Sequence, residues 1–254
     1  MLYTNPVKEK IAAGGVVIGP FIQFPSPEMI EVVALAGFDF AFLDGEHGRI
    51  SPEDAYPMIL AAEANGIPAL ARVGQNDRQV ILKFLDLGIS GVMIPQTNTE
   101  ASARDAVQAM RYHPRGIRGL AGGRSFGYGM GGAAHELVPR INDRVLSIIQ
   151  FEHIDALAEL DALMAIPDLD MLFVGPNDLA QSMGFPGQPG HADVEAVIAQ
   201  ISERARGRIP LGTVAADANA INKRIEQGFQ MLVPNVAVLL ATGSKNVLAG
   251  VNRP

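Results

Sequence analysis

The chain contains no cysteine and no tryptophan. Without cysteine it cannot form disulfides, attack a substrate through a thiol or bind a metal through thiolate sulfur. Aromatic residues make up only 6% of the 254 residues, whereas hydrophobic residues of all kinds make up 48%. The core must therefore be built mainly from Ala, Val, Ile and Leu, which is the usual filling of α/β proteins.

Positive charge is also scarce. The chain has 20 Lys and Arg against 27 Asp and Glu, a net charge of -7, and no Lys/Arg run exceeds two residues, so we expect neither a nucleic acid nor an anionic membrane as partner. The first residues lack the apolar centre of a signal peptide, and no apolar run approaches the ~20 residues of a membrane span. These absences predict a soluble cytoplasmic protein that acts on a small molecule.

Short apolar runs alternate with amphipathic segments from end to end, and nothing marks a linker, so residues 1–254 are interpreted as a single domain. Eight runs are typical of buried strands: residues 16–21, 38–43, 68–72, 91–95, 146–151, 171–174, 210–214 and 229–234. Helices are expected at 26–36, 52–65, 77–87, 99–110, 154–165, 192–206 and 217–227.

Local signals support these helices. Ser26-Pro27 and Ser51-Pro52 each place a capping side chain before a first-turn proline, and Gly37, Gly66, Gly88 and Gly228 each close a helix before the next strand. Eight such units in a chain of this length favour a (β/α)₈ barrel over an open doubly wound sheet. A further apolar helix at 236–251 is expected to pack either on another subunit or under its own barrel.

The alternation of strands and helices is interrupted at residues 112–143, where a long glycine-rich connection replaces a short loop. Loops of this length in a compact domain are usually functional. Its G-x-G-x-x-G spacing follows no buried strand and is interpreted as chance. Four arginines, Arg111, Arg115, Arg118 and Arg124, are candidates to meet an anionic substrate or a neighbouring subunit, with solvated surface as the alternative.

Reactive residues of a (β/α)₈ barrel come from the carboxyl ends of its strands. The second expected strand runs directly into Asp44-Gly45-Glu46-His47, so His47 is a candidate general base with an acid close by, the alternative being a histidine that caps the loop. Glu152 and Asp178 follow the fifth and sixth strands. Two carboxylates at adjacent strand ends can share Mg²⁺, Mn²⁺ or Co²⁺, although ordinary salt bridges remain an alternative.

Two other chemistries are not supported by the sequence. A Schiff base needs a lysine in the mouth of the barrel, whereas Lys8 and Lys10 lie in the N-terminal tail and the other three lysines fall in expected helices. A serine hydrolase of the nucleophile-elbow type needs G-x-S-x-G, which does not occur.

The blocks FLDGEHG, ALARVG, LDLGISGVMIP, RYHPRGIRG, QFEH and VGPNDLAQSMG, in this order and spacing, resemble the HpcH/HpaI aldolases, which are metal-dependent class II pyruvate aldolases. The similarity extends from about residue 15 to 248. It implies a TIM barrel of the phosphoenolpyruvate/pyruvate-binding type with an extra C-terminal helix, and homohexamers that exchange this helix. It also implies pyruvate and an aldehyde as the small molecules handled, with a divalent metal as cofactor.

Carried over by motif, the resemblance makes His47 the catalytic base, Arg72 the group that stabilises the transition state, and Glu152 and Asp178 the metal ligands. Gln150 and backbone groups of Asn177 and Asp178 would hold the keto acid, with Arg72 also touching it. The family gives an aspartate in the L-D-x-G block the task of raising the basicity of the histidine. Here that residue is Asp86, expected near a helix end far from its own mouth, so that it would act across a subunit interface; Asp44 is the local alternative.

The sequence departs from the family pattern at two positions, both of which concern the part of the site that would hold the aldehyde. Family members often have Trp near the first strand end and Asp in a block before the last helix, where this chain has Phe21 and Asn235. We interpret the chain as an aldolase that reversibly cleaves 4-hydroxy-2-oxo acids to pyruvate and an aldehyde through a pyruvate enolate. The alternatives are a CoA-thioester lyase of the citrate lyase β type and a keto-acid-binding barrel without turnover.

Overall fold

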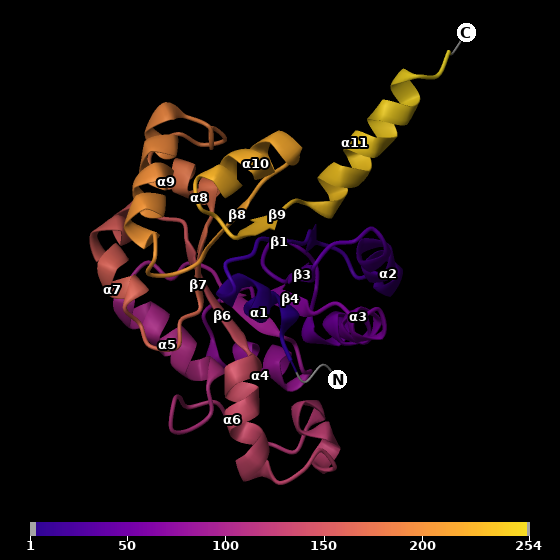
Figure 1. The fold of residues 1–254 in the computed structure, drawn as a ribbon, viewed down its shortest axis with the longest axis vertical. Coiled ribbons are helices and arrows are strands. Elements are labelled where there is room, and N and C mark those ends of the chain that lie inside the picture. The colour runs from indigo at the N-terminus through magenta and orange to yellow at the C-terminus, as the bar shows by residue number, and fades with distance from the viewer. Residues whose placement is uncertain (1–3, 253–254) are drawn as a thin grey trace.

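Parallel strands make one curled sheet with helices on its outer side in the computed structural model, which describes residues 4–252 (Figure 1). The strands are β1 Val17–Ile18, β2 Phe21–Ile22, β3 Ala41–Asp44, β4 Ala69–Arg72, β5 Gly91–Ile94, β6 Leu146–Phe151, β7 Met171–Val174, β8 Leu211–Val214 and β9 Met231–Val233. The helices are α1 Pro6–Ala12, α2 Pro27–Leu35, α3 Pro52–Ala64, α4 Arg78–Asp86, α5 Glu100–Met110, α6 Ala134–Arg144, α7 Leu160–Met164, α8 Pro176–Ser182, α9 Ala192–Ala205, α10 Ala218–Glu226 and α11 Val236–Ala249, with 3₁₀ segments η1 Arg124–Gly129 and η2 Ile154–Glu159. All eight expected strands are present.

The first expected strand is divided in two. β1 pairs with β9 and β2 pairs with β3, and only Gly19 and Pro20 separate β1 from β2. The nine-stranded order β1-β9-β8-β7-β6-β5-β4-β3-β2 therefore begins and ends with strands that are consecutive in the chain. Gly19 is required at the break, because a Cβ there would lie 2.3 Å from the carbonyl oxygen of Phe40.

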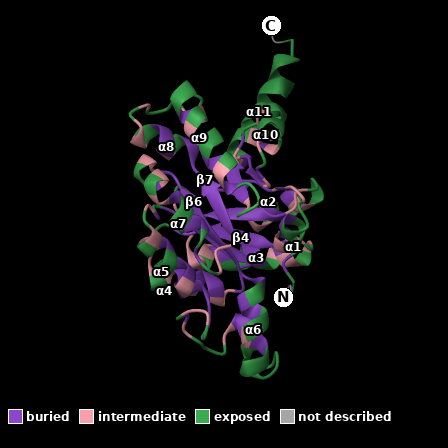
Figure 2. Ribbon diagram, turned by 60° about the vertical axis from the view of Figure 1, so that its left-hand side comes forward, coloured by how far each residue is buried: buried purple, intermediate pink, exposed green. Residues whose placement is uncertain are grey.

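The strands are buried, as Figure 2 shows. Their two faces build two separate apolar clusters. Along β3, Phe42 joins the cluster on the concave face, whereas Ala41 and Leu43 join the larger cluster beneath the helices. This alternation follows from the two-residue period of a strand. It leaves the carboxyl end of each strand, where the apolar run stops, as the place for polar side chains.

The helix signals read from the sequence are confirmed. The Ser26 and Ser51 hydroxyls accept hydrogen bonds from the backbone N–H groups of Met29 and Asp54, and Asp54 completes a capping box at the start of α3. The four glycines expected after helices all have positive φ, between 74° and 92°. Short caps of this kind fix where each helix begins and therefore how each loop at the strand ends is aimed.

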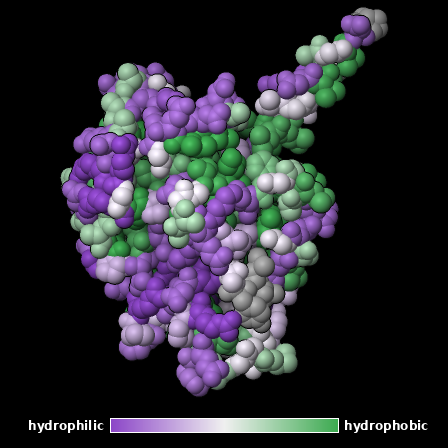
Figure 3. Space-filling view, in the orientation of Figure 1, coloured by the Kyte–Doolittle hydropathy of each residue, from purple (hydrophilic) through white to green (hydrophobic). Residues whose placement is uncertain are grey.

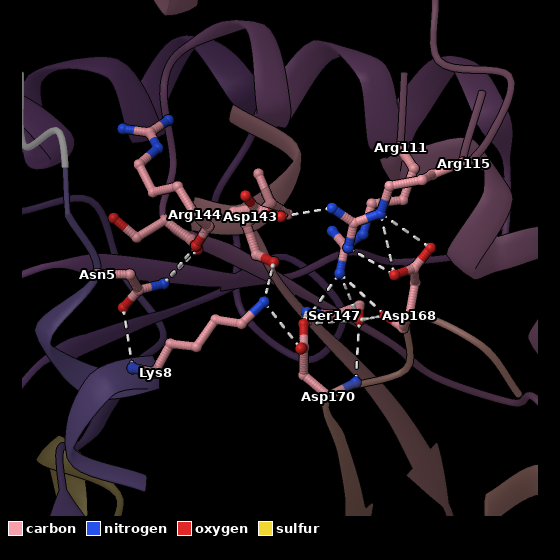
Figure 4. Close-up of polar contacts among 11 residues, drawn as sticks. Asn5, Lys8, Arg111, Arg115, Asp143, Arg144, Ser147, Asp168 and Asp170 are labelled. Carbon is pink, nitrogen blue, oxygen red and sulfur yellow. Dashed lines mark hydrogen bonds and ion pairs between the residues drawn. The ribbon is translucent and has the colours of Figure 1, made fainter. Parts of the chain in front are cut away.

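The N-terminal tail expected from the sequence is instead a helix. α1 places Val7 and Ile11 in the cluster on the concave face, so it covers the end of the sheet where the strands begin. Asn5 donates to the carbonyl oxygens of Ser90 and Arg144, and Lys8 Nζ lies 2.8 Å from Asp170 Oδ1 (Figure 4). Lys8 is thus a structural cation at the end of the fold opposite the strand ends.

The long connection at 112–143 contains η1 and most of α6, neither of which was predicted. Its four arginines form intramolecular ion pairs: Arg111 with Asp170, Arg115 with Asp143 and Asp168, Arg118 with Asp86, and Arg124 with Glu63. Figure 4 shows Arg111 and Arg115 beside Asp168. The guanidinium groups of Arg111 and Arg118 are fully buried, so the solvated-surface reading is wrong for them.

α11 does not dock under its own sheet but extends away from the body (Figure 1). Leu240, Val247 and Leu248 are at least half-exposed along it, and Figure 3 shows apolar surface at its base and along part of its length. Helix α11 is 14 residues long. Among residues 4–252, no helix combines the length and apolar character needed to cross a membrane.

Candidate active site

Polar side chains at the ends of β3, β4, β6 and β7 converge on one pocket with a volume of about 640 Å³. This size lies in the range of small-molecule sites. The predicted residues that line it are His47, Arg72, Gln150, Asn177 and Asp178. The site therefore lies at the carboxyl ends of the strands, as the strand-end argument predicted.

Arg72 and Asp44 form the fixed centre of the pocket wall. Arg72 donates from Nε to Asp44 Oδ1 at 2.9 Å and from Nη2 to Oδ2 at 2.7 Å, and both side chains are more than nine-tenths buried. Burial alone would raise the pKa of Asp44, but hydrogen bonds and charge from Arg72, with the backbone N–H groups of His47 and Glu46, bring it below the ordinary value. Asp44 is therefore an anion that orients the guanidinium.

The remaining donors of Arg72 face Glu46 and the pocket. Arg72 Nη1 lies 3.1 Å from Glu46 Oε2, and the guanidinium carbon lies 4.6 Å from the centre of the Phe21 ring. Stacking on an aromatic face holds a guanidinium flat without consuming its N–H groups. Phe21, one of the two departures noted in the sequence, thus supports Arg72 from below.

Asn235, the other departure, belongs to the same network. The Asn235 amide nitrogen donates to Gln23 Oε1 at 2.9 Å, and Gln23 Nε2 in turn donates to Asp44 Oδ2 at 3.5 Å. Asn235 Oδ1 caps α11 by accepting hydrogen bonds from the N–H groups of Ala237 and Val238. An amide suits this position because it both donates and accepts. The start of α11 is therefore tied to the buried Asp44–Arg72 pair.

His47 projects from the loop after β3 with its side chain 55% exposed. Asp44 holds the backbone N–H of His47 at 3.2 Å, whereas the acid nearest to the imidazole is Glu46, at 3.9 Å from Nε2. The local alternative considered for a histidine partner, Asp44, therefore fixes the loop and is occupied by Arg72. The exposed imidazole is free to approach a ligand in the pocket.

The carboxylates of Glu46, Glu152 and Asp178 lie close enough to act on one another's charge. Glu152 and Glu46 are both buried, burial raises the pKa of each, and the charge of Asp178 raises both further. Glu152 Oε1 accepts the backbone N–H of Gln96 at 2.6 Å, and Gln96 holds a left-handed conformation at φ 55° to aim that group. A strained backbone conformation persists only where the surrounding structure holds it in place. Here the left-handed conformation of Gln96 directs its N–H at Glu152, which stabilises that carboxylate beside other negative charges.

A glycine leaves room beside these acids. A Cβ at Gly175 would lie 3.1 Å from both Gln150 Nε2 and Glu152 Cβ. Gln150 Nε2 donates to Glu152 Oε2, and the buried Gln150 Oε1 has no hydrogen-bond partner. A buried acceptor without a donor is costly unless a ligand or ion satisfies it.

The donor set suits a hard divalent cation that takes only part of its coordination from protein. Within the described part of the chain, no group of three or more His, Cys, Asp or Glu side chains is arranged to hold a metal. Glu152 and Asp178 offer two carboxylates. Burial and then the charges of Glu46 and Asp178 raise the pKa of Glu152, and a bound cation would favour its charged form. Mg²⁺ and Mn²⁺ accept such sites because substrate and water oxygens complete their shells.

Comparison with known proteins agrees with this geometry. The family model for HpcH/HpaI aldolase/citrate lyase matches residues 18–237. The chain belongs to this family. A hydroxypyruvate/pyruvate aldolase from Sagittula stellata is 33% identical over 243 residues, covering 94% of this chain and 95% of that protein. A 2-keto-3-deoxy-L-rhamnonate aldolase from Klebsiella pneumoniae is 31% identical, covering 95% of this chain and 90% of that one.

Solved structures show the same fold. A crystal structure of an HpcH/HpaI aldolase/citrate lyase family protein from Burkholderia cenocepacia has a TM-score of 0.91 and 28% identity, and covers 97% of this chain and 98% of that chain. Membership in a family of aldolases and lyases makes this HpcH/HpaI protein a carbon–carbon lyase.

One predicted residue lies away from the others. Asp86 is the last residue of α4, at the opposite end of the fold from the pocket, where its Oδ1 accepts from Arg118 Nη2 at 2.9 Å. It does not line the pocket. Within one chain the structure therefore brings together His47, Arg72, Gln150 and the acids, and leaves Asp86 apart.

Sequence reasoning missed several contributors. Glu46 was read as part of the polar cluster but given no role, although it contacts Arg72 and shares the acidic wall. The backbone of Gln96 was not foreseen, because its use depends on a left-handed φ. Glu195, Lys223 and Arg224, which line the outer part of the pocket, lie on α9 and α10 and carried no motif.

Proposed function

We propose that this protein is a metal-dependent class II aldolase that reversibly cleaves 4-hydroxy-2-oxo acids to pyruvate and an aldehyde through a pyruvate enolate. The observation that carries the proposal is that one pocket is lined by Arg72, which the buried Asp44 holds, and by Asp178, whose charge acts on the buried Glu152 beside it. A fixed guanidinium together with carboxylates that can hold a cation suits a keto acid whose oxygens must be held while charge develops on them.

Each side chain has a task that follows from its position. Arg72 is held rigidly by Asp44 and stacked on Phe21, so it is preorganised to stabilise negative charge on the enolate or alkoxide. His47 is exposed at the mouth and moves the proton at C3 of pyruvate or at the hydroxyl of the aldol. Gln150 orients the keto acid at the inner end of the pocket.

Backbone groups complete the anion-holding side. Asn177 and Asp178 lie in the first turn of α8, where the first helical bond runs from the N–H of Leu179 to the carbonyl of Gly175. N–H groups in a first helical turn lack intrahelical acceptors. They are available to the carboxylate of the keto acid.

Glu152 and Asp178 would hold the divalent cation, Mg²⁺, Mn²⁺ or Co²⁺. When bound, such a cation polarises the keto oxygen of pyruvate and so acidifies the C3 protons. The chain keeps Glu152 in place through the N–H of Gln96 and the amide of Gln150. These contacts hold the carboxylate ready in spite of its neighbours' charge.

We also propose that the curled sheet is a closed (β/α)₈ barrel in which β1 and β2 count as one interrupted strand, and that α11 packs on a neighbouring copy in a homo-oligomer, a hexamer by resemblance. The exposed apolar side chains of α11 support the second proposal. Asp86, paired with Arg118, would then reach the histidine of a neighbour.

Two alternative functions, a CoA-thioester lyase and a binding protein without turnover, would require different features of the structure. A CoA-thioester lyase requires a basic groove for the cofactor phosphates, whereas the arginines of the 112–143 connection are committed to intramolecular ion pairs. A binding protein without turnover would not need a base, yet His47 stands exposed at the mouth. Both alternatives are tested together with the main proposal.

The test is exchange of the pyruvate C3 protons in deuterated water, followed by NMR. The Mn²⁺-loaded protein should exchange them without any aldehyde, and EDTA should stop the exchange. Addition of an aldehyde should then yield a 4-hydroxy-2-oxo acid. Exchange that persisted at full rate after chelation would rule out the class II mechanism.

A further inference from the structure

Gln23 follows β2 directly and lines the pocket, yet the reaction proposed above gives it no task. Its side chain contacts Asp44 on one side and Asn235 on the other, and its backbone contacts the loop that carries His47. Catalytic side chains are held in productive geometry by neighbours whose own positions are fixed. Gln23 therefore lies where one residue can support both Arg72 and the histidine loop.

The backbone of Gln23 supports the histidine loop. Its carbonyl oxygen accepts a hydrogen bond from the N–H of Arg49, two residues beyond His47, at 3.0 Å. Gly48 makes this approach possible, because a Cβ there would lie 2.8 Å from both the Cα and the carbonyl oxygen of Gln23. The contact depends on the main chain alone, so it survives a substitution of the Gln23 side chain.

The side chain of Gln23 joins the start of α11 to the buried ion pair. Gln23 Oε1 accepts from Asn235 Nδ2 at 2.9 Å, and Gln23 Nε2 donates to Asp44 Oδ2 at 3.5 Å. An amide suits this place because one end must accept and the other must donate. Asp44 Oδ2 also accepts from Arg72 Nη2 at 2.7 Å, so Gln23 contacts the carboxylate oxygen that holds the guanidinium.

Asn235 decides where the Gln23 amide lies, because its hydrogen bond to Gln23 is short whereas the contact of Gln23 with Asp44 is long. Asn235 is itself fixed in two ways. Its Oδ1 accepts from the N–H of Ala237 at 2.8 Å, and its backbone forms a parallel bridge with Phe21.

The bridge to Phe21 adds a second connection between α11 and Arg72. The N–H of Phe21 donates to the carbonyl oxygen of Pro234 at 2.8 Å, and the Phe21 ring lies 4.6 Å from the guanidinium carbon of Arg72. The residues before α11 thus fix the ring on which the guanidinium stacks, while Gln23 fixes the carboxylate that it pairs with.

We propose that Gln23 is a positioning residue of the aldolase reaction, through which Asn235 at the start of α11 holds the Asp44–Arg72 pair in place. The inference rests on the proposed aldolase activity and extends it to residues that act through Arg72. Arg72 stabilises charge that develops as the enolate forms, so a displaced guanidinium weakens the transition state more than it weakens bound pyruvate. Loss of the link should therefore lower kcat more than it raises KM.

Two substitutions break the link from opposite ends. Gln23→Leu keeps the approximate shape of the side chain and the backbone contact with Arg49, but removes both amide groups. Asn235→Ser keeps an oxygen that can cap α11 but is too short to reach Gln23. Each should lower kcat for exchange of the pyruvate C3 protons by the Mn²⁺-loaded protein about tenfold, since a displacement of ~1 Å can cost about 10²-fold, with a smaller change in KM for pyruvate.

The double variant distinguishes one shared link from two separate effects. If both residues act through the same contact, Gln23→Leu combined with Asn235→Ser should lose no more activity than either single variant, whereas independent losses multiply. Asn76→Ser is the matched control, because Asn76 is an exposed amide that donates to the carbonyl oxygen of Ser102 and does not line the pocket. Its kcat should equal that of the wild type. All rates are measured at a temperature at which thermal unfolding shows each variant to be folded.

Three results would overturn the proposal: exchange at the wild-type rate in both single variants, losses that multiply in the double variant, or a rise in KM without a fall in kcat, which would make Gln23 a ligand of pyruvate. The wild type separates the two levels of inference. Exchange by the wild type without the expected effects refutes only the positioning role. Absence of exchange in the wild type refutes the aldolase assignment and the positioning role with it.

Discussion

Arg72 and Asp44, at the ends of adjacent strands β4 and β3, form a two-bond ion pair in which the aspartate is fully buried. Their strands are in register, with Asp44 opposite Arg72. The pair therefore follows directly from strand pairing and needs no loop to hold it. Catalytic groups on strand ends are positioned more exactly than groups on loops.

Removing the anion of this pair should destabilise the fold. Asp44→Asn leaves Arg72 buried with a single acidic neighbour, Glu46, and loss of one partner of a buried pair costs about 3 kcal/mol or more. Urea unfolding of the metal-free protein at pH 7 measures this difference. Asp161→Asn is the control, because Asp161 is 62% exposed in its pairs with Arg204 and Arg208 and its loss should cost less than about 1 kcal/mol. Equal effects of the two substitutions would contradict the buried-pair assignment.

The same pair gives a pH dependence with a definite sign. Arg72 and two backbone N–H groups outweigh burial and hold the pKa of Asp44 below its ordinary value, so the unfolded chain binds the proton more tightly than the folded one. The contribution of Asp44 is complete above the unfolded value of about 3.9 and is lost as the pH falls through the lower folded value. The difference in unfolding free energy between wild type and Asp44→Asn should therefore be constant from pH 7 to 5 and shrink below pH 4. If the difference in unfolding free energy instead grew as the pH fell, the pKa of Asp44 would be raised in the folded protein rather than lowered.

Metal binding should appear in stability as well as in turnover. Mn²⁺ should raise the Tm of the wild type because it relieves the repulsion among Glu152, Glu46 and Asp178. Glu152→Gln should lose this Mn²⁺-dependent rise and the exchange activity, yet its metal-free Tm should be no lower than that of the wild type, since one repelling charge is gone. Thermal unfolding with and without Mn²⁺ measures both effects. Glu203→Gln, on the exposed surface of α9, should respond to Mn²⁺ as the wild type does; a full rise in Glu152→Gln would remove Glu152 from the metal site.

The base is tested separately from the metal. His47→Ala should lose exchange of pyruvate C3 protons about 10²-fold or more while it keeps the Mn²⁺-dependent rise in Tm, because the imidazole is not one of the groups proposed to hold the metal. His135→Ala, exposed on α6, is the control. Exchange at the wild-type rate in His47→Ala would assign the proton transfer to another group.

Strand ends were the most predictable part of the molecule. The apolar run before Asp44 identified β3, and the strand-end rule then placed His47, Arg72, Gln150 and Asp178 in one pocket. This succeeded because parallel strands expose their carboxyl ends on one side whatever the details of the loops.

Long-range charge pairing could not be predicted. Arg111 is buried because it pairs with Asp170, 59 residues away. The sequence around either residue does not predict this contact. The Lys223–Glu195 contact joins α10 to α9 in the same way. A charged residue in an isolated sequence is most often solvated, so a tertiary partner is needed before burial can be foreseen.

Helices α1 and α6 were also not predicted. α1 has seven residues and buries only Val7 and Ile11, so its periodicity is too brief to distinguish from a tail. α6 contains Pro139, and proline inside a segment lowers its helical preference. Packing on the sheet decides both helices, which is information that the sequence of the segment does not carry.

The remaining prediction concerns α11. Leu240 and Val247 are exposed and seven residues apart, so they lie on one stripe of the helix. If that stripe packs on a neighbouring copy, Leu240→Glu combined with Val247→Glu should place two charges in an apolar interface and yield smaller species in light scattering. Gln200→Glu, on the exposed side of α9, adds one charge elsewhere and should keep the wild-type mass.

Activity in the same variant tests whether Asp86 works in trans. Because Asp86 lies far from its own pocket and is held by Arg118, it can assist a histidine only on another copy. Dissociation should then lower proton exchange to the level of Asp86→Asn in the intact assembly. Smaller species that exchange at the wild-type rate would keep the interface but remove Asp86 from the site, and an unchanged mass would refute the interface role of α11 itself.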